Sequence, residues 1–189
     1  ASCGITGELA IPDNVKTIGD DSFNSCKSIS NLKLGAGIIT IGKSAFHTCE
    51  NISGAIEIPD SVTSIGDNAF YYCSGLTSIE IPSSVTSIGN SAFSNCTGIE
   101  TITIPDSVES LGSYAFEGCS NLKSIKLPKK LEALEYDMFL YCSNLEEVYL
   151  SNNIKNIENN VFDSCKKLTK IHYDGTISEW SKIKLYSFS

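Results

Sequence analysis

Eight cysteines recur along this chain at an almost constant interval. They stand at positions 3, 26, 49, 73, 96, 119, 142 and 165, so six of the seven intervals are 23 residues and one is 24. A disulfide framework has irregular spacings, because its bridges close loops of different lengths. The same residue at a fixed period instead indicates the same environment once in every structural unit. The sequence therefore predicts a repeat protein.

Phenylalanine and proline keep the same period. A phenylalanine stands three residues before every cysteine except Cys3, and all five prolines occupy one repeat position. The unit reads I-P-x-x-V-x-x-I-G-x-x-A-F-x-x-C-x-x-L-x-x-I-x. We divide the 189 residues, taken as one domain, into a partial repeat (1–10), seven repeats (11–172) and a C-terminal cap (173–189). Because Cys3 lacks its phenylalanine, the array begins within a unit, and we expect the chain to be part of a longer array.

Each unit carries the pattern of two short strands and a turn. Residues 76–81 alternate apolar and polar side chains, which predicts a strand with one buried face that ends at Pro82. A second extended stretch, 85–88, leads to a glycine that gives the backbone freedom for a corner. Glu135 and Glu158 take the place of this glycine in the last two units, so the position does not need a conformation restricted to glycine. The A-F-x-x-C segment is expected to form a short helical or 3₁₀ turn.

A unit of 23 residues cannot bury its own apolar side chains, but stacked coils can. The predicted core consists of columns of phenylalanine, cysteine, leucine or isoleucine, and alanine. This consensus resembles the BspA-like leucine-rich repeats. The resemblance implies a right-handed stack of coils, mainly β, with a parallel sheet on a concave face. The tail from Tyr173 to Trp180 also resembles the Y-x-G-T-x-x-E-W ending that follows such arrays, and we expect Trp180 and Ile183 to cover the last coil.

The cysteine column is interpreted first as a set of buried free thiols, which behave as small apolar side chains. Disulfides between adjacent coils are the alternative, although parallel side chains would hold the Cβ atoms farther apart than a disulfide prefers. Zinc fits less well, because the chain has neither a C-x-x-C pair nor a cluster of histidines. No metal and no cofactor are expected.

Several classes of function have no support in the sequence. The 14 basic residues are outnumbered by 22 acidic ones, so a nucleic-acid partner is not expected. No apolar run approaches the roughly 18 to 20 residues of a membrane helix, so no membrane insertion is expected within this segment. His47 and His172 have no triad partner in sequence, and no phosphate-binding loop is present. We therefore expect a protein that is not an enzyme.

The remaining candidates lie on the face of the predicted sheet that points away from the core. Its outward positions form two columns, which vary in sequence where the core does not. Tyr149 is the aromatic residue in these columns, and aromatic side chains are enriched at interface centres. The candidate binding residues around it are Lys126, Glu147, Tyr149, Lys170 and His172.

We expect a non-catalytic interaction module that binds an unidentified protein or glycan through its concave face. The resemblance implies an adhesion role, at a cell surface or after secretion, and we expect a monomer. A structural spacer or stalk that presents another domain is the alternative. A regulatory domain of an enzyme would require a catalytic domain outside this segment.

Overall fold

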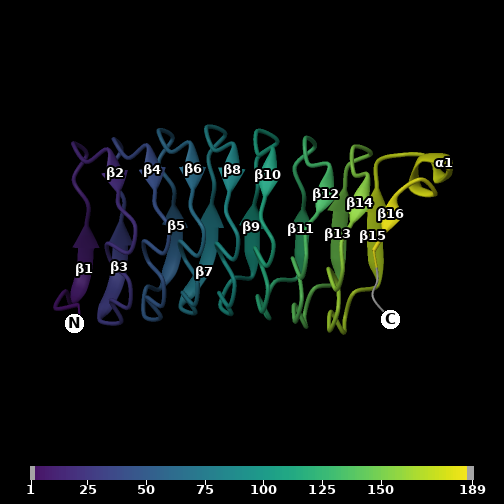
Figure 1. Cartoon of the computed structure of the whole chain (residues 1–189). Coiled ribbons are helices and arrows are strands. Elements are labelled where there is room, and N and C mark those ends of the chain that lie inside the picture. Colours follow the sequence, from purple (N-terminus) through teal and green to yellow (C-terminus); the bar gives the residue numbers. More distant parts are fainter. Residues whose placement is uncertain (1–2, 187–189) are drawn as a thin grey trace.

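The computed structural model describes residues 3–186, which form an elongated stack of flat coils (Figure 1). Each coil before the last contains a long strand, a bend at the proline position, a short strand, and a turn that carries F-x-x-C. The long strands are β1 (Gly7–Ala10), β3 (Ile29–Lys33), β5 (Gly54–Glu57), β7 (Leu76–Glu80), β9 (Thr101–Thr103), β11 (Ser124–Lys126), β13 (Glu147–Leu150) and β15 (Lys170–Tyr173).

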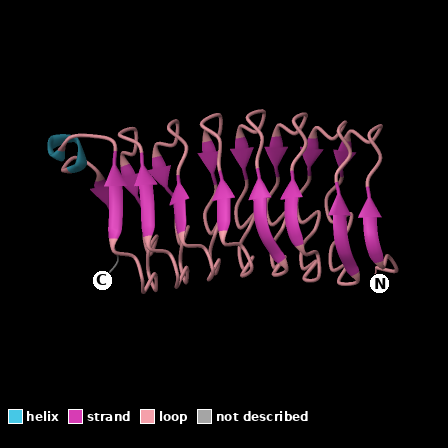
Figure 2. Cartoon of the chain, turned by 180° about the vertical axis from the view of Figure 1, so that it is seen from behind, coloured by secondary structure: helices cyan, strands magenta, loops and turns pink. Residues whose placement is uncertain are grey.

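The short strands have two residues each and lie in a second row behind the long strands (Figure 2). They are β2 (Thr17–Ile18), β4 (Thr40–Ile41), β6 (Ser64–Ile65), β8 (Ser87–Ile88), β10 (Ser110–Leu111), β12 (Ala133–Leu134), β14 (Asn156–Ile157) and β16 (Lys184–Leu185). Within residues 3–186 the one helix is α1 (Ile177–Trp180).

All strand pairs are parallel and link neighbouring coils. Most keep the register that the period predicts, but β14 pairs with β16 across 28 residues, and the register shifts after Gly7 in β1 and after Gly54 in β5. Ile79 of β7 pairs with Ile102 of β9, and Val148 of β13 pairs with Ile171 of β15. The long strands form the groups β1–β3, β5–β7–β9 and β11–β13–β15, and the short strands form β2–β4–β6–β8–β10 and β12–β14–β16. The fold is therefore the parallel leucine-rich-repeat coil stack that the sequence predicts.

The F-x-x-C turns form a third ladder of backbone hydrogen bonds between coils. The N–H of Phe46 donates to the carbonyl of Ala69 over 2.8 Å, and the N–H of Phe70 donates to that of Ala92. The expected helical turn is instead a pair of tight turns. The residue before the alanine position and the residue before the cysteine both have φ between 52° and 67°, which interrupts any helix.

The repeated glycine serves close packing rather than a corner with positive φ. A Cβ atom on Gly89 would lie 2.5 Å from the backbone nitrogen of Asp67 in the preceding coil, and one on Gly112 would lie 2.5 Å from that of Asn90. Neither glycine has a positive φ. Glycine at this position therefore lets these coils approach closely, whereas Glu158 holds the same repeat position with a side chain and still donates its N–H to Leu134 of the preceding coil over 2.9 Å.

The core lies between the rows of strands and consists of the predicted columns. Phe46, Phe70, Phe93, Phe116 and Phe139 are fully buried. Successive phenylalanine rings stack with centroids 5.3 to 5.8 Å apart and planes within 15° of parallel. Each ring therefore packs between its neighbours along the array, and most of the apolar burial is made between coils.

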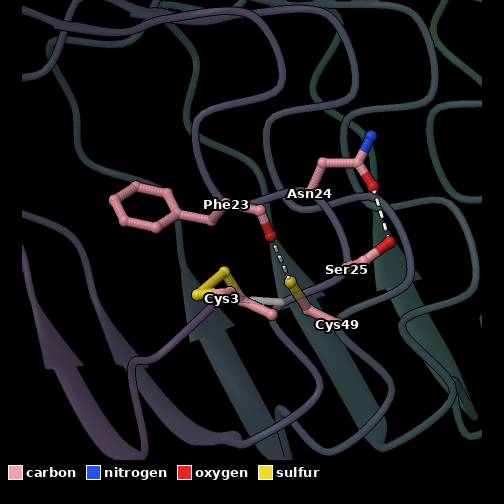
Figure 3. Close-up of a disulfide and its surroundings, with 6 residues drawn as sticks. Cys3, Phe23, Asn24, Ser25 and Cys49 are labelled. Carbon is pink, nitrogen blue, oxygen red and sulfur yellow. Dashed lines mark hydrogen bonds between the residues drawn. A yellow bond between two sulfur atoms is a disulfide. The ribbon is translucent and has the colours of Figure 1, made fainter. Parts of the chain in front are cut away.

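The prediction of free thiols is wrong for the first two cysteines. Cys3 and Cys26 form a disulfide, with Cα atoms 4.9 Å apart (Figure 3). The Sγ atoms of Cys3 and Cys26 turn toward each other instead of lying parallel. Six cysteines are free, and five of them are buried: Cys49, Cys73, Cys96, Cys119 and Cys142, with Cys165 partly buried.

A repeated hydrogen bond keeps the free thiols apart from one another. Cys49 Sγ donates to the carbonyl of Phe23 in the preceding coil over 3.0 Å (Figure 3), and the same bond recurs for the five later cysteines. Burial raises the pKa of the Cys96 thiol to about 12 and that of Cys49 to about 11. These thiols are therefore protonated core groups at neutral pH.

The coils of β9–β10 and β11–β12 are joined less closely than the others, and we call this junction the seam. Neither β9 with β11 nor β10 with β12 forms a ladder. The backbone N–H groups of Glu109 and Gly112 donate hydrogen bonds to the preceding coil, but those of Glu132 and Glu135, one repeat later, do not. The turn ladder continues across the seam, because the N–H of Phe116 donates to the carbonyl of Met138 over 3.0 Å.

An open cleft of about 470 Å³ lies at the seam, and its lining includes Glu109, Leu111, Lys130 and Glu135. Three exposed ion pairs cross the seam: Lys123 with Glu100 (2.9 Å), Lys129 with Asp106 (3.6 Å) and Lys130 with Glu109 (2.8 Å).

The C-terminal segment adds β16 beside β14, while α1 projects beyond the end of the stack (Figure 1). Thr176 and Glu179 form a capping box at the start of α1. Ile183 packs partly against the core. Trp180 contacts Tyr173 edge to face, with centroids 5.2 Å apart, and stays 37% exposed. Trp180 therefore contacts the last long strand through Tyr173 and remains partly exposed.

Candidate binding surface

The candidate residues lie on three adjacent long strands. Glu147 and Tyr149 are on β13, Lys170 and His172 are on β15, and Lys126 is on β11. Because parallel pairing sets Tyr149 between Lys126 and His172, and Glu147 beside Lys170, the five residues share one face of the sheet. The structure thus brings all five together, as the two columns predict.

Glu147 is the centre of the cluster. Its carboxylate accepts hydrogen bonds from Lys170 Nζ over 2.8 Å and from the Tyr149 hydroxyl over 2.8 Å, and its Oε2 lies 3.1 Å from His172 Nε2. Lys170, Tyr149 and His172 together lower the pKa of Glu147 to about 2. The bond to this carboxylate in turn raises the pKa of the Tyr149 hydroxyl. The carboxylate is therefore ionised throughout the neutral range.

An exposed pair of rings stands beside this carboxylate. The rings of Tyr149 and His172 stack with centroids 4.2 Å apart and planes 4° from parallel. Tyr149 is 39% exposed and the side chain of His172 is 42% exposed. The hydrogen bonds to Glu147 restrict both rings, so a partner would meet a surface that is already ordered.

Lys126 lies next to Tyr149 but stands outside the hydrogen-bonded group. Among residues 3–186, no acidic side chain forms an ion pair with it, whereas Lys170 is bound to Glu147. The cluster therefore offers a planar aromatic stack with a cation on its β11 side.

The rest of the same face differs in charge along the array. Glu57 on β5 and Glu80 on β7 are register neighbours, and both are exposed. Thr101 and Thr103 follow on β9, before the basic and aromatic residues of the C-terminal half. From β5 to β15 the face therefore changes from acidic, through neutral, to mixed aromatic and charged, whereas β1 and β3 carry the ion pair of Glu8 with Lys33. The five candidate residues occupy its C-terminal part.

The described residues hold no group of three or more His, Cys, Asp or Glu side chains that could bind a metal ion. The buried thiols have raised pKa values and donate to backbone carbonyls, so they do not supply an activated nucleophile at this surface. Across residues 3–186, no helix has the length and apolar character needed to cross a membrane.

The family model of the BspA type leucine-rich repeat region (6 copies) matches this chain over two overlapping stretches, residues 1–97 and 63–189. The chain belongs to the BspA-type leucine-rich repeat family. Leucine-rich repeats of this kind are generally protein-interaction modules, and the family and fold are typically non-enzymatic.

Solved structures of bacterial leucine-rich repeat proteins are similar to this BspA-type array. The Treponema pallidum leucine-rich repeat protein TpLRR is 29% identical, with a TM-score of 0.79 over 86% of this chain and 78% of its own. A leucine-rich repeat protein from Bacteroides ovatus is 33% identical, with a TM-score of 0.83 over 87% of this chain and 45% of its own. The pneumococcal vaccine antigen PcpA shares the fold at 16% identity, with a TM-score of 0.63 over 97% of this chain and 63% of its own. The comparison with curated proteins gave no match.

The sequence indicated which residues share a column but not how they bond. The central role of Glu147 depends on side-chain contacts across 2, 23 and 25 residues. Of these, the 23-residue spacing could have been read from the period, because it equals one coil. The stacking of Tyr149 on His172 is also a contact between adjacent coils.

Proposed function

We propose that this BspA-type array is a non-catalytic interaction module that binds a protein partner through its long-strand face. The stacked, exposed pair of Tyr149 and His172 carries the proposal. Aromatic side chains dominate the energetics of many interfaces, and ordering them before binding reduces the entropy lost on association. The contact residues we assign are Lys126, Glu147, Tyr149, Lys170 and His172.

We further propose a site of action at a cell surface or after secretion. A vaccine antigen of pneumococcus shares the fold, and the BspA-type family match points in the same direction. The Cys3–Cys26 disulfide is compatible with an oxidising compartment. Adhesion to a protein of another cell or of the extracellular matrix is the activity that fits these features best.

A binding screen tests the assignment. The chain is assayed by biolayer interferometry against a panel of purified extracellular-matrix proteins, together with Tyr149→Ala and His172→Ala. We expect at least one protein to bind, and each substitution to weaken that binding roughly tenfold or more, as for residues at the centre of an interface.

Thr101→Ala and Glu80→Ala are matched controls, because they lie on the same face outside the cluster. Both should bind as the parent does, and all four variants should keep its melting temperature within a few degrees. Binding that survives both ring substitutions would place the contact elsewhere. If no substitution along the long-strand face changed binding, a structural spacer would be favoured instead.

A further inference from the structure

A second surface lies on the turn edge, where the backbone is strained. Fourteen turn residues have left-handed φ values between 52° and 67°. Eleven of them are Asp, Asn, Ser, Thr or Gly, which tolerate this conformation at low cost. The other three are tyrosines: Tyr72 (φ 59°), Tyr114 (φ 60°) and Tyr141 (φ 63°). A bulky residue in this region is an outlier that calls for an explanation.

Burial does not compensate for the strain. Tyr72 is 43% exposed and Tyr141 is 57% exposed. Ser25, Thr48, Asn95 and Ser164 fill the same repeat position in other coils, so the turn itself does not require a tyrosine. The two rings are therefore present for a reason other than packing or turn geometry.

Tyr72 and Tyr141 stand on the same edge, three coils apart. The turn ladder connects them in order through backbone hydrogen bonds. The N–H groups of Tyr72, Asn95 and Gly118 donate to the backbone carbonyls of Ser94, Glu117 and Leu140, respectively. With about 4.8 Å between adjacent coils, the two tyrosines lie roughly 14 Å apart along the stack. Asn95 and Gly118 occupy the two places between them.

Hydrogen-bond acceptors lie between the two rings. Gly118 has no side chain, and Asn95 Oδ1 lies 2.6 Å from the position that a Cβ atom there would take. Asn95 Nδ2 donates to Ser94 Oγ over 2.9 Å, and Ser94 Oγ donates to Glu117 Oε2 over 3.1 Å. These bonds use one N–H of Asn95 and the hydroxyl of Ser94, and leave Asn95 Oδ1 and the second carboxylate oxygen of Glu117 as acceptors, with the other N–H of Asn95 beside them.

The aromatic surface extends beyond Tyr72 toward the N-terminus. The ring of Tyr71 lies 5.1 Å from that of Tyr72 and stacks on His47 with centroids 4.8 Å apart. Among residues 3–186, no lysine forms an ion pair with Glu117. The surface thus combines exposed aromatic faces with acceptors and a negative charge.

We propose that this surface, formed by Tyr71, Tyr72, Asn95, Glu117 and Tyr141, binds a short uncharged oligosaccharide. The C–H face of a sugar ring packs on a tyrosine ring, and sugar hydroxyls donate to Asn95 Oδ1 and Glu117. Hydrogen-bond acceptors with no paired lysine suit the uncharged hydroxyl groups of a sugar. The Glu117 carboxylate and the net charge of −8 repel anionic glycans. This site is separate from the long-strand face.

The double variant Tyr72→Asn/Tyr141→Asn tests the proposal, since Asn occupies the same position in another coil. Because it relieves backbone strain, we expect its melting temperature to rise above that of the parent. Electrophoresis in gels containing mannan, laminarin, galactomannan or soluble chitin oligosaccharides measures binding. At least one of these should retard the parent, and the double variant should bind it at least tenfold more weakly.

Two single variants serve as controls. Tyr114→Asn relieves the same strain at the other left-handed turn position and should keep carbohydrate binding, as should Tyr149→Ala on the long-strand face. Glu117→Gln should weaken binding without unfolding the chain. A double variant that melts below the parent, or binds as it does, overturns the proposal. Retardation by heparin or polygalacturonate alone, or by none of the neutral glycans, overturns it as well.

Discussion

At the scale of single residues, two of the polar contacts that recur between coils differ in their surroundings. Cysteine thiols donate to phenylalanine carbonyls in the core, and charged side chains pair across strands on the surface. Surface pairs generally add little to stability, because water and salt weaken them. Glu147 differs from the other surface carboxylates, since it has three partners in one place. Its value lies in the ordering of Tyr149 and His172.

The pKa of Glu147 reports this order directly. We expect a carboxyl titration followed by NMR to show a midpoint near 2 for Glu147, because Lys170, Tyr149 and His172 all bind the ionised form. Since this pKa is depressed in the folded state, the network contributes stability above the pKa of the unfolded chain, and the contribution is lost as pH falls toward 2.

Substitution of Lys170 separates the contributions to this shift. Lys170→Met removes the largest cause and should move the Glu147 midpoint up toward 4.5. Lys155→Met, which removes an ion pair with Glu132 on another part of the surface, should leave it unchanged. An ordinary midpoint in the parent protein would show that the hydrogen-bonded cluster does not form in solution.

At the scale of strands and turns, the period predicted most of what the structure contains. A residue and its counterpart 23 positions later occupy equivalent places, so strand register follows from counting, as for Ile79 and Ile102. The Cys3–Cys26 disulfide was not predictable in this way, because the same period holds for all eight cysteines and does not distinguish the bonded pair from the six free thiols. Side-chain hydrogen bonds at Glu147 depend on rotamers, which a period does not encode.

The seam is the other feature that the period conceals. In the five coils before the seam, glycine holds the repeat position that follows the short strand. Glu135 is the first residue at that position with a side chain. A Cβ atom on Gly42, Gly66, Gly89 or Gly112 would lie 2.5 to 2.7 Å from the nearest atom of the preceding coil. The loss of pairing between β10 and β12 coincides with this first side chain in place of glycine. Glu158 follows Glu135 at the same place, and the coils of β12 and β14 pair normally.

Hydrogen exchange should detect the seam. We expect the amides of Glu132 and Glu135 to exchange about tenfold or more faster than those of Glu109 and Gly112, which donate to the preceding coil over 2.9 and 3.0 Å. Glu135→Gly should slow exchange across residues 131–135, because it allows the two coils to approach. Equal protection in the parent at all four amides would contradict the open junction.

At the scale of the whole molecule, stability is shared between neighbouring coils, because each phenylalanine packs between two others. Phe93 is fully buried, with Phe70 and Phe116 stacked at 5.7 and 5.8 Å on its two sides. Phe162 stacks on Phe139 alone and is only partly buried. In a linear array, a coil in the middle supports two interfaces and a coil at the end supports one.

This difference predicts that the cost of a deletion depends on its place in the array. Phe93→Ala should lower the free energy of unfolding by about 3 to 5 kcal/mol, since it leaves a cavity between two rings, and Phe162→Ala by roughly half as much. Urea titrations followed by circular dichroism measure both, with Thr103→Ala as a surface control. In the Phe93 variant, neighbouring coils should unfold with the damaged one, because both lose a stacking partner. Equal costs at the two positions, or a Phe93 variant as stable as the parent, would rule out a core built from contacts between coils.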